Sequence, residues 1–140
     1  MSAGPVYGYN PFTGNLDQRT NNTGPNAPYP GGVTAWQFVI GTTQFMTINR
    51  GYIINNPALC TLYLPVNCGY GSYFRVVGHG IGGWLIQCNA GQSIHYGVKD
   101  STVGGSLSST AQYDSIEILC TGDNLDFTII AGPQGNLITA

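Results

Sequence analysis

The sequence predicts an all-β protein, with a single antiparallel β-sandwich or jelly-roll-like domain over residues 33–140 and an extended N-terminal arm over residues 1–32. The first observation behind this prediction is a series of short runs rich in β-branched and aromatic residues, bounded by Gly, Pro and Asn. The second is that several runs carry apolar residues at every other position, as in a strand with a buried face. The third is that no segment carries apolar residues at helical spacing for more than about two turns.

The composition limits the classes of partner. Charged residues make up only 7% of the chain, against about 25% in ordinary soluble domains. A surface so poor in charge must be covered by small polar residues or lie against other subunits. The net charge of −2 and the four scattered cationic residues provide no basic patch for nucleic acid. The apolar runs are too short to span a membrane, and we expect no signal peptide, because the amino terminus lacks its basic and apolar regions.

Residues 1–32 differ from the rest of the chain. They hold five prolines among Gly, Asn and Thr and show no sustained strand or helix period, so they cannot form a core of their own. They nevertheless carry several aromatic and aliphatic side chains. This leaves two interpretations: a solvated tail, or an assembly arm that docks onto a neighbouring subunit or a larger particle. The residues predicted to anchor such an arm are Tyr7, Tyr9, Pro11, Phe12, Leu16 and Tyr29.

The domain begins with two runs, Trp36 to Ile40 and Gln44 to Ile48, that predict a hairpin or a bent strand around Gly41-Thr42. A strand over Tyr52 to Ile54 follows. The next run, Leu59 to Leu64, is largely apolar on both faces, which predicts either a central strand or a subunit contact.

The stretch from Ser72 to Gly97 predicts three strands, at Tyr73 to Val77, Trp84 to Asn89 and Gln92 to Tyr96. The glycine-rich link before Trp84 is expected to take positive φ and to let a neighbouring backbone approach closely. The predicted core anchors are Trp84, Ile86 and Ile118. Trp84 and Ile86 share one strand face.

A loop is expected over residues 98–112, followed by strands over Ser115 to Thr121, Leu125 to Ala131 and Gly135 to Thr139. About eight short strands with turns between them are typical of a sandwich or a jelly roll. No internal repeat of fixed period is evident.

The four cysteines form no C-x-x-C pair. Cys60, Cys88 and Cys120 share strand parity with apolar residues, which favours buried free thiols over disulfides. Cys68 is expected to be reachable from solvent, since it lies in a predicted loop.

Catalytic and metal-binding patterns are weak. His79 and His95 lack converging ligands nearby in the sequence, so we expect neither a metal nor a cofactor. Glu117 and Asp126 lie on adjacent predicted strands, where two carboxylates could act on a glycosidic bond, but nothing distinguishes them from surface charge. We therefore expect a protein that is not an enzyme.

Several motifs are shared with a known family. In chain order they are Asn10-Pro11-Phe12-Thr13-Gly14-Asn15-Leu16-Asp17, Gly51-Tyr52-Ile53-Ile54-Asn55-Asn56, Leu62-Tyr63-Leu64-Pro65, Gly83-Trp84, Gln87, Asn89-Ala90-Gly91-Gln92, Ile94-His95, Gly97, Gly104-Gly105-Ser106-Leu107-Ser108-Ser109-Thr110, Gln112-Tyr113-Asp114-Ser115 and Gln134-Gly135-Asn136. In these motifs the chain resembles a β-domain of bacteriophage tail-fibre and virion appendage proteins, over most of residues 8–140. The resemblance implies a commonly trimeric, structural or host-contacting piece, and it brings no catalytic residues.

These observations predict a non-enzymatic, self-assembling structural protein: a tail-fibre, spike or capsid-decoration subunit of a phage-like virion, located in the virion. One alternative is a subunit of an extracellular filament. Another is a carbohydrate-binding module with Trp36, Trp84 or tyrosines as stacking platforms, although the parity of Trp84 favours the core. The expected partners are further copies of the chain, as a trimer or polymer, other virion proteins and a host surface glycan.

Overall fold

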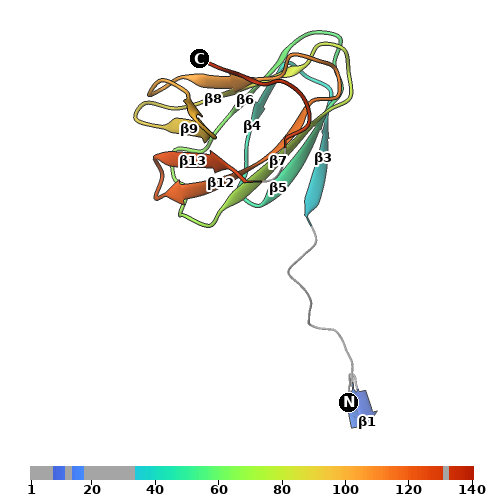
Figure 1. The fold of residues 1–140 in the computed structure, drawn as a ribbon. Coiled ribbons are helices and arrows are strands. Elements are labelled where there is room, and N and C mark those ends of the chain that lie inside the picture. Colours follow the sequence, from blue (N-terminus) through green and yellow to red (C-terminus); the bar gives the residue numbers. More distant parts are fainter. Residues whose placement is uncertain (1–7, 12–13, 18–33, 131–132) are drawn as a thin grey trace. The chain divides into compact units, whose positions relative to one another are not determined.

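The computed structural model describes residues 8–11, 14–17, 34–130 and 133–140. In this part of the chain every regular element is a β-strand (Figure 1). The chain divides into two compact units, Met1–Thr34 and Ala35–Ala140. The second unit consists of two packed sheets, so the predicted all-β sandwich is confirmed.

The first unit contains a small hairpin that the sequence did not predict. Strand β1 (Gly8–Pro11) pairs antiparallel with β2 (Gly14–Asp17). These strands are short and rich in Gly, Asn and Pro, so they carry no alternation of apolar side chains from which pairing could be predicted. Tyr9, Pro11 and Leu16 lie in the hairpin strands. The other expected arm anchors, Tyr7, Phe12 and Tyr29, lie outside the described residues.

The larger sheet has seven strands in the order β10–β9–β13–β12–β7–β5–β3. Their bounds are β10 (Lys99–Asp100), β9 (Ser93–Tyr96), β13 (Asp126–Ile129), β12 (Ser115–Gly122), β7 (Tyr73–Gly78), β5 (Arg50–Ile54) and β3 (Ala35–Val39). The smaller sheet has the order β14–β11–β8–β6–β4. Its strands are β14 (Ile138–Thr139), β11 (Ser106–Ser108), β8 (Trp84–Gln87), β6 (Cys60–Tyr63) and β4 (Thr43–Phe45). The expected loop over 98–112 thus contains β10 and β11, which are too short to show an alternating pattern.

The strand pairing is mixed, which corrects the predicted antiparallel, jelly-roll-like arrangement. From β3 to β8 the chain alternates between the two sheets, and β3, β4, β5 and β6 each pair in parallel with the strand two positions later in the chain. These six strands form three successive turns of the chain around the core, each with one strand in either sheet. We call these turns coils: β3 with β4, β5 with β6, and β7 with β8. The runs predicted as a hairpin or bent strand, β3 and β4, do not pair with each other and lie in different sheets. Antiparallel pairs occur mainly among the later strands, such as β12 with β13.

The core lies between the two sheets. Fully buried side chains include Tyr52, Phe74, Ile118 and Phe127 from the larger sheet and Leu62, Trp84 and Ile86 from the smaller one. The three residues predicted as core anchors are therefore inside. The indole N–H of Trp84 donates to the backbone oxygen of Asp114 at 2.9 Å, so the buried ring leaves no unsatisfied donor.

The glycine-rich link between β7 and β8 passes close to neighbouring backbone, as predicted. A Cβ at Gly80 would collide with the backbone of Asn56, and a Cβ at Gly82 would collide with the backbone of Ala58. Gly83 takes a φ of +73°, which glycine adopts without the cost that a Cβ imposes.

Asn89 and Gln92 join three loops at one end of the sandwich. The buried Gln92 side chain donates to the backbone oxygens of Pro65 and Asn124, each at 2.9 Å. Its side-chain oxygen accepts from the backbone nitrogen of Asn89 at 2.8 Å, and Asn89 donates to Leu64 at 2.6 Å. The motif Asn89-Ala90-Gly91-Gln92 therefore has a structural role in this chain.

All four cysteines are buried free thiols, which confirms the prediction for Cys60, Cys88 and Cys120. The expectation that Cys68 is reachable is wrong, because only 2% of its surface is exposed. Its loop lies under the turn at Asn124, whose side chain accepts a hydrogen bond from the Cys68 backbone nitrogen. Burial raises the pKa of Cys68, and also that of Cys88, to about 11.

Candidate assembly surface

Both sheets end in an open edge at the first coil. Strand β3 is the outermost strand of the larger sheet and β4 is the outermost strand of the smaller one. Within the described residues, no strand pairs with the outer side of either. Figure 1 shows β3 along one side of the domain, beside β5. The first coil therefore presents two rows of backbone groups that another strand could bind.

The sequence along this edge lacks the residues that usually prevent pairing with another chain. Residues 34–49 contain neither a charged residue nor a proline, although proteins commonly use both to prevent edge strands from pairing with other chains. The far edges of the sheets differ. Strand β10 consists only of Lys99 and Asp100, and β14 also has two residues. The longer uncharged edges are therefore those of β3 and β4, because the far edges consist of strands of only two residues.

Large apolar side chains are exposed on the same coil. We call Phe38, Ile40, Phe45 and Ile48 the open-end surface; between 42% and 72% of each residue is exposed. Phe45 stacks on Tyr63 of the adjacent strand, with ring centroids 5.4 Å apart. Because Gln37 and Gln44 face each other between the sheets, their neighbours along each strand point outward. Phe38 thus lies on the outer face of the larger sheet and Phe45 on the outer face of the smaller one. The open edges are flanked by exposed apolar side chains on both faces, which is typical of a protein interface.

A pair of glutamines lies on the first coil between the two sheets. Gln37 of β3 donates a hydrogen bond to the side-chain oxygen of Gln44 of β4 at 3.0 Å. Arg50 donates to Gln37 at 3.5 Å. Both glutamines are partly buried. The space between the two sheets is therefore polar at the first coil, whereas the exposed side chains of the open-end surface are apolar.

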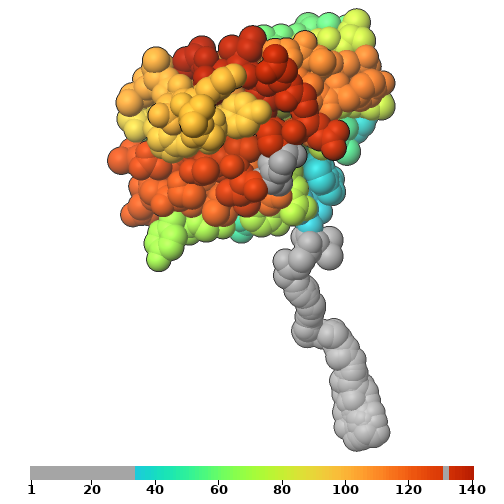
Figure 2. Space-filling view, viewed as in Figure 1, coloured from blue at the N-terminus to red at the C-terminus, as the bar shows by residue number. Residues whose placement is uncertain are grey.

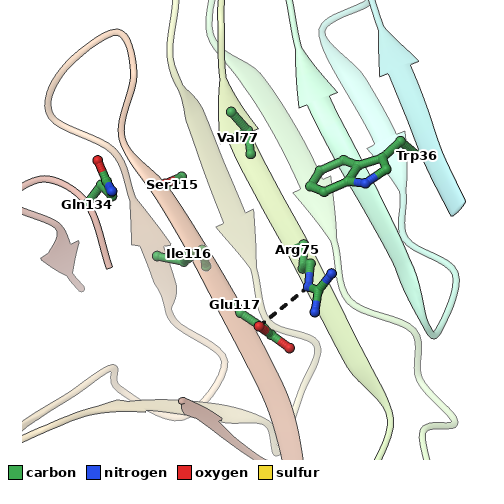
Figure 3. A pocket seen from close by; sticks show the side chains of 7 residues that line it. All are labelled: Trp36, Arg75, Val77, Ser115, Ile116, Glu117 and Gln134. Atoms are coloured by element: carbon green, nitrogen blue, oxygen red, sulfur yellow. Dashed lines mark ion pairs between the residues drawn. The ribbon is translucent and has the colours of Figure 1, made fainter. Parts of the chain in front are cut away.

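The two carboxylates considered for glycoside hydrolysis do not form a facing pair. Glu117 forms an ion pair with Arg75, with Oε1 3.4 Å from Nε (Figure 3). Its backbone oxygen accepts from Ile130, whereas Asp126 lies farther along β13, opposite Gly122. Each carboxylate is engaged in a separate polar cluster, so their geometry offers no acid–base pair.

Asp126 instead belongs to a cluster around His95. The Nδ1 atom of His95 lies 2.7 Å from Asp100 and its Nε2 atom lies 3.2 Å from Asp126. The hydrogen bond with Asp100, and then that with Asp126, raise the pKa of His95 above its ordinary value. The spacing between His95 and Asp100 on a tight hairpin could have indicated the first contact. The second depends on the parallel pairing of β9 with β13 and carries no local signal.

Other candidate sites receive less support. Among the described residues, no group of three or more His, Cys, Asp or Glu side chains is arranged to hold a metal ion. Trp84 is fully buried and cannot serve as a sugar platform, whereas Trp36 remains half exposed. In the part of the chain that the structure describes, no helix is long and apolar enough to cross a membrane.

Comparison with the models of known protein families found no matching family, and comparison with curated proteins found no matching relative.

Proposed function

We propose that this chain is a non-enzymatic structural subunit that self-associates through the first coil. The observation that carries the proposal is the pair of open edges, β3 and β4, which lack charge and proline and lie beside the exposed open-end surface. Pairing of a further strand at such an edge satisfies its backbone groups, while the apolar side chains supply buried area.

The resemblance to tail-fibre and appendage proteins supports a more specific proposal, that the assembly is an appendage of a phage-like virion. The low content of charged residues, 7% of the chain, agrees with a surface that is largely covered in an assembly. An extracellular filament is the alternative. Electron microscopy of the purified protein distinguishes fibres, compact trimers and extended filaments.

A charge placed on the open-end surface tests the association. Phe45→Lys should shift the protein to monomer, because a lysine at this 72% exposed position cannot be buried against another chain without a large desolvation cost. The matched control is Val103→Lys, at a position that is also 72% exposed but lies outside the first coil. Size-exclusion chromatography with light scattering gives the molar mass of each variant.

The proposal fails if the unmodified protein is a monomer over the accessible concentration range. It also fails if Phe45→Lys associates as well as the Val103→Lys control.

A further inference from the structure

A shallow hollow of about 210 Å³ lies on the larger sheet, between Trp36 of the edge strand β3 and residues of β7 and β12. It is lined by Trp36, Arg75, Val77, Ser115, Glu117 and Gln134, among others (Figure 3). The strand register explains why these residues meet. Trp36 is beside Gly51, Gly51 is beside Arg75, and Arg75 is beside Glu117, so one row of four neighbouring strands builds the site.

Gly51 makes room for the Trp36 ring. A Cβ at Gly51 would lie 2.5 Å from a ring carbon of Trp36, so the indole lies directly over the backbone of β5. With 47% of the residue exposed, Trp36 presents an aromatic surface that is already held in place. A prearranged aromatic platform loses little conformational entropy when a ligand covers it.

The polar groups around the ring are balanced in charge. Arg75 and Glu117 neutralise each other through their ion pair, and Ser115 and Gln134 add uncharged donors and acceptors. An anionic or cationic ligand would have to compete with this pair. A neutral ligand with several hydroxyl groups could bind to both its donors and its acceptors.

The size and form of the hollow also restrict the ligand. Enclosed pockets for drug-sized molecules measure about 300–1,000 Å³, so a shallow site of about 210 Å³ suits one small ring that enters from the surface. A pyranose has an apolar C–H face that can lie on an aromatic ring and hydroxyl groups at its rim.

We propose that this hollow binds a neutral sugar residue of a glycan, stacked on Trp36 and hydrogen-bonded by Arg75 and Glu117. This inference goes beyond the proposed assembly role and does not depend on it, because the Phe45→Lys variant leaves the hollow intact.

The chain has two tryptophans, and Trp84 has no exposed surface, so quenching of tryptophan fluorescence by acrylamide reports on Trp36. The full-length protein is titrated with the methyl glycosides of glucose, galactose, mannose and N-acetylglucosamine, and with N-acetylneuraminic acid. We expect at least one neutral sugar to protect the fluorescence from quenching. Saturation-transfer NMR should show contact with the ring protons of the same sugar.

The variants locate the site. Trp36→Ala should weaken binding by about tenfold or more, the equivalent of losing one aromatic contact, and Glu117→Gln should also weaken it. Tyr70→Ala is the matched control, because it removes an exposed aromatic ring that lies outside both the first coil and the hollow and should leave sugar binding unchanged. Saturation-transfer NMR is the readout for all three.

Three results would overturn the proposal: no neutral sugar binds at millimolar concentration, binding survives in Trp36→Ala, or only the acidic sugar binds. A fourth is that raising the protein concentration without sugar protects Trp36 from quenching, since a second copy would then cover the hollow.

Discussion

At the scale of single residues, burial separates side chains of the same type. The two tryptophans illustrate this, because Trp84 has no exposed surface while 47% of Trp36 is exposed. The glycines divide in the same way. Gly82 lies against the backbone of Ala58, whereas a Cβ at Gly69 would meet nothing within 4 Å. Residue type alone therefore does not predict the effect of a substitution.

Trp84→Ala should lower the free energy of unfolding by about 3–5 kcal/mol, because it opens a cavity in the core and removes the hydrogen bond to Asp114. Trp36→Ala is the control and should cost no more than about 1.5 kcal/mol. Urea unfolding at one fixed protein concentration measures both. Equal losses for the two variants would contradict the core position of Trp84.

Gly82→Ala should lower the free energy of unfolding by about 1–3 kcal/mol, since the new methyl group must displace the backbone of Ala58. Gly69→Ala is the matched control. Its φ is not in the left-handed region and the space beside it is open, so its stability should remain close to that of the unmodified protein. Thermal melts of the two variants provide the comparison. A Gly82→Ala protein that melts with the control would show that the link does not need its close approach.

At the scale of secondary-structure elements, the two edges of the larger sheet differ in charge and in strand length. Strand β3 forms an uncharged open edge, whereas the far edge is the short hairpin of β9 and β10. In Figure 2 this hairpin, coloured yellow to gold, projects at one side of the domain. His95 links three strands there, since it contacts Asp100 of β10 and Asp126 of β13. The hairpin should therefore respond to pH.

Both ring nitrogens of His95 face carboxylates, so the protonated imidazole is the form that satisfies both contacts. Because the folded-state pKa is raised, the stabilisation is fully present below the ordinary histidine pKa and is lost as the pH rises through the raised value. Hydrogen-exchange protection of the Ser93–Tyr96 amides should fall over that interval. NMR titration should place the His95 pKa above the ordinary value, and Asp100→Asn should lower it.

His79→Gln is the control that should leave the His95 titration unchanged. An ordinary pKa for His95 would contradict the prediction.

At the scale of the whole molecule, one end of the coiled strands is open and the other is closed by the later antiparallel strands. A chain built in this way can associate through its open end by two routes. Either the open ends of two copies meet directly, or the N-terminal arm of one copy adds a strand to the edge of another. The arm has five prolines, which restrict φ and so reduce the entropy lost when it is ordered.

Deletion of residues 1–30 distinguishes the two routes. We expect the truncated protein to keep its far-UV circular dichroism, because Ala35–Ala140 forms a compact unit of its own, and to lose association. The measurements are circular dichroism and light scattering, with Phe45→Lys in the full chain as the comparison. If the truncated protein assembles as well as the full chain, the copies meet through their open ends and the arm is not the assembly device.

The sequence by itself determined the positions of most strands from Trp36 onward, but not those of the short strands β10 and β11, and it determined the buried face where apolar residues alternate clearly. Trp84, Ile86 and Ile118 could be assigned to the core because the two-residue period of a strand is a local property. It did not determine which strands pair. Ala35 pairs with Arg50 and Arg50 with Phe74, and these unequal intervals hide the three coils from any search for a fixed repeat.

Only the tertiary structure decided the features that carry the proposals. The open edges at β3 and β4, the row from Trp36 to Glu117 and the contact between His95 and Asp126 all depend on pairing between strands that are not neighbours in the chain. Such pairing is set by how two sheets pack over a shared core and not by the residues of either strand alone. The alternation of apolar side chains along a strand therefore predicted which residues are buried in the core. The packing of the two sheets determined which exposed residues lie side by side.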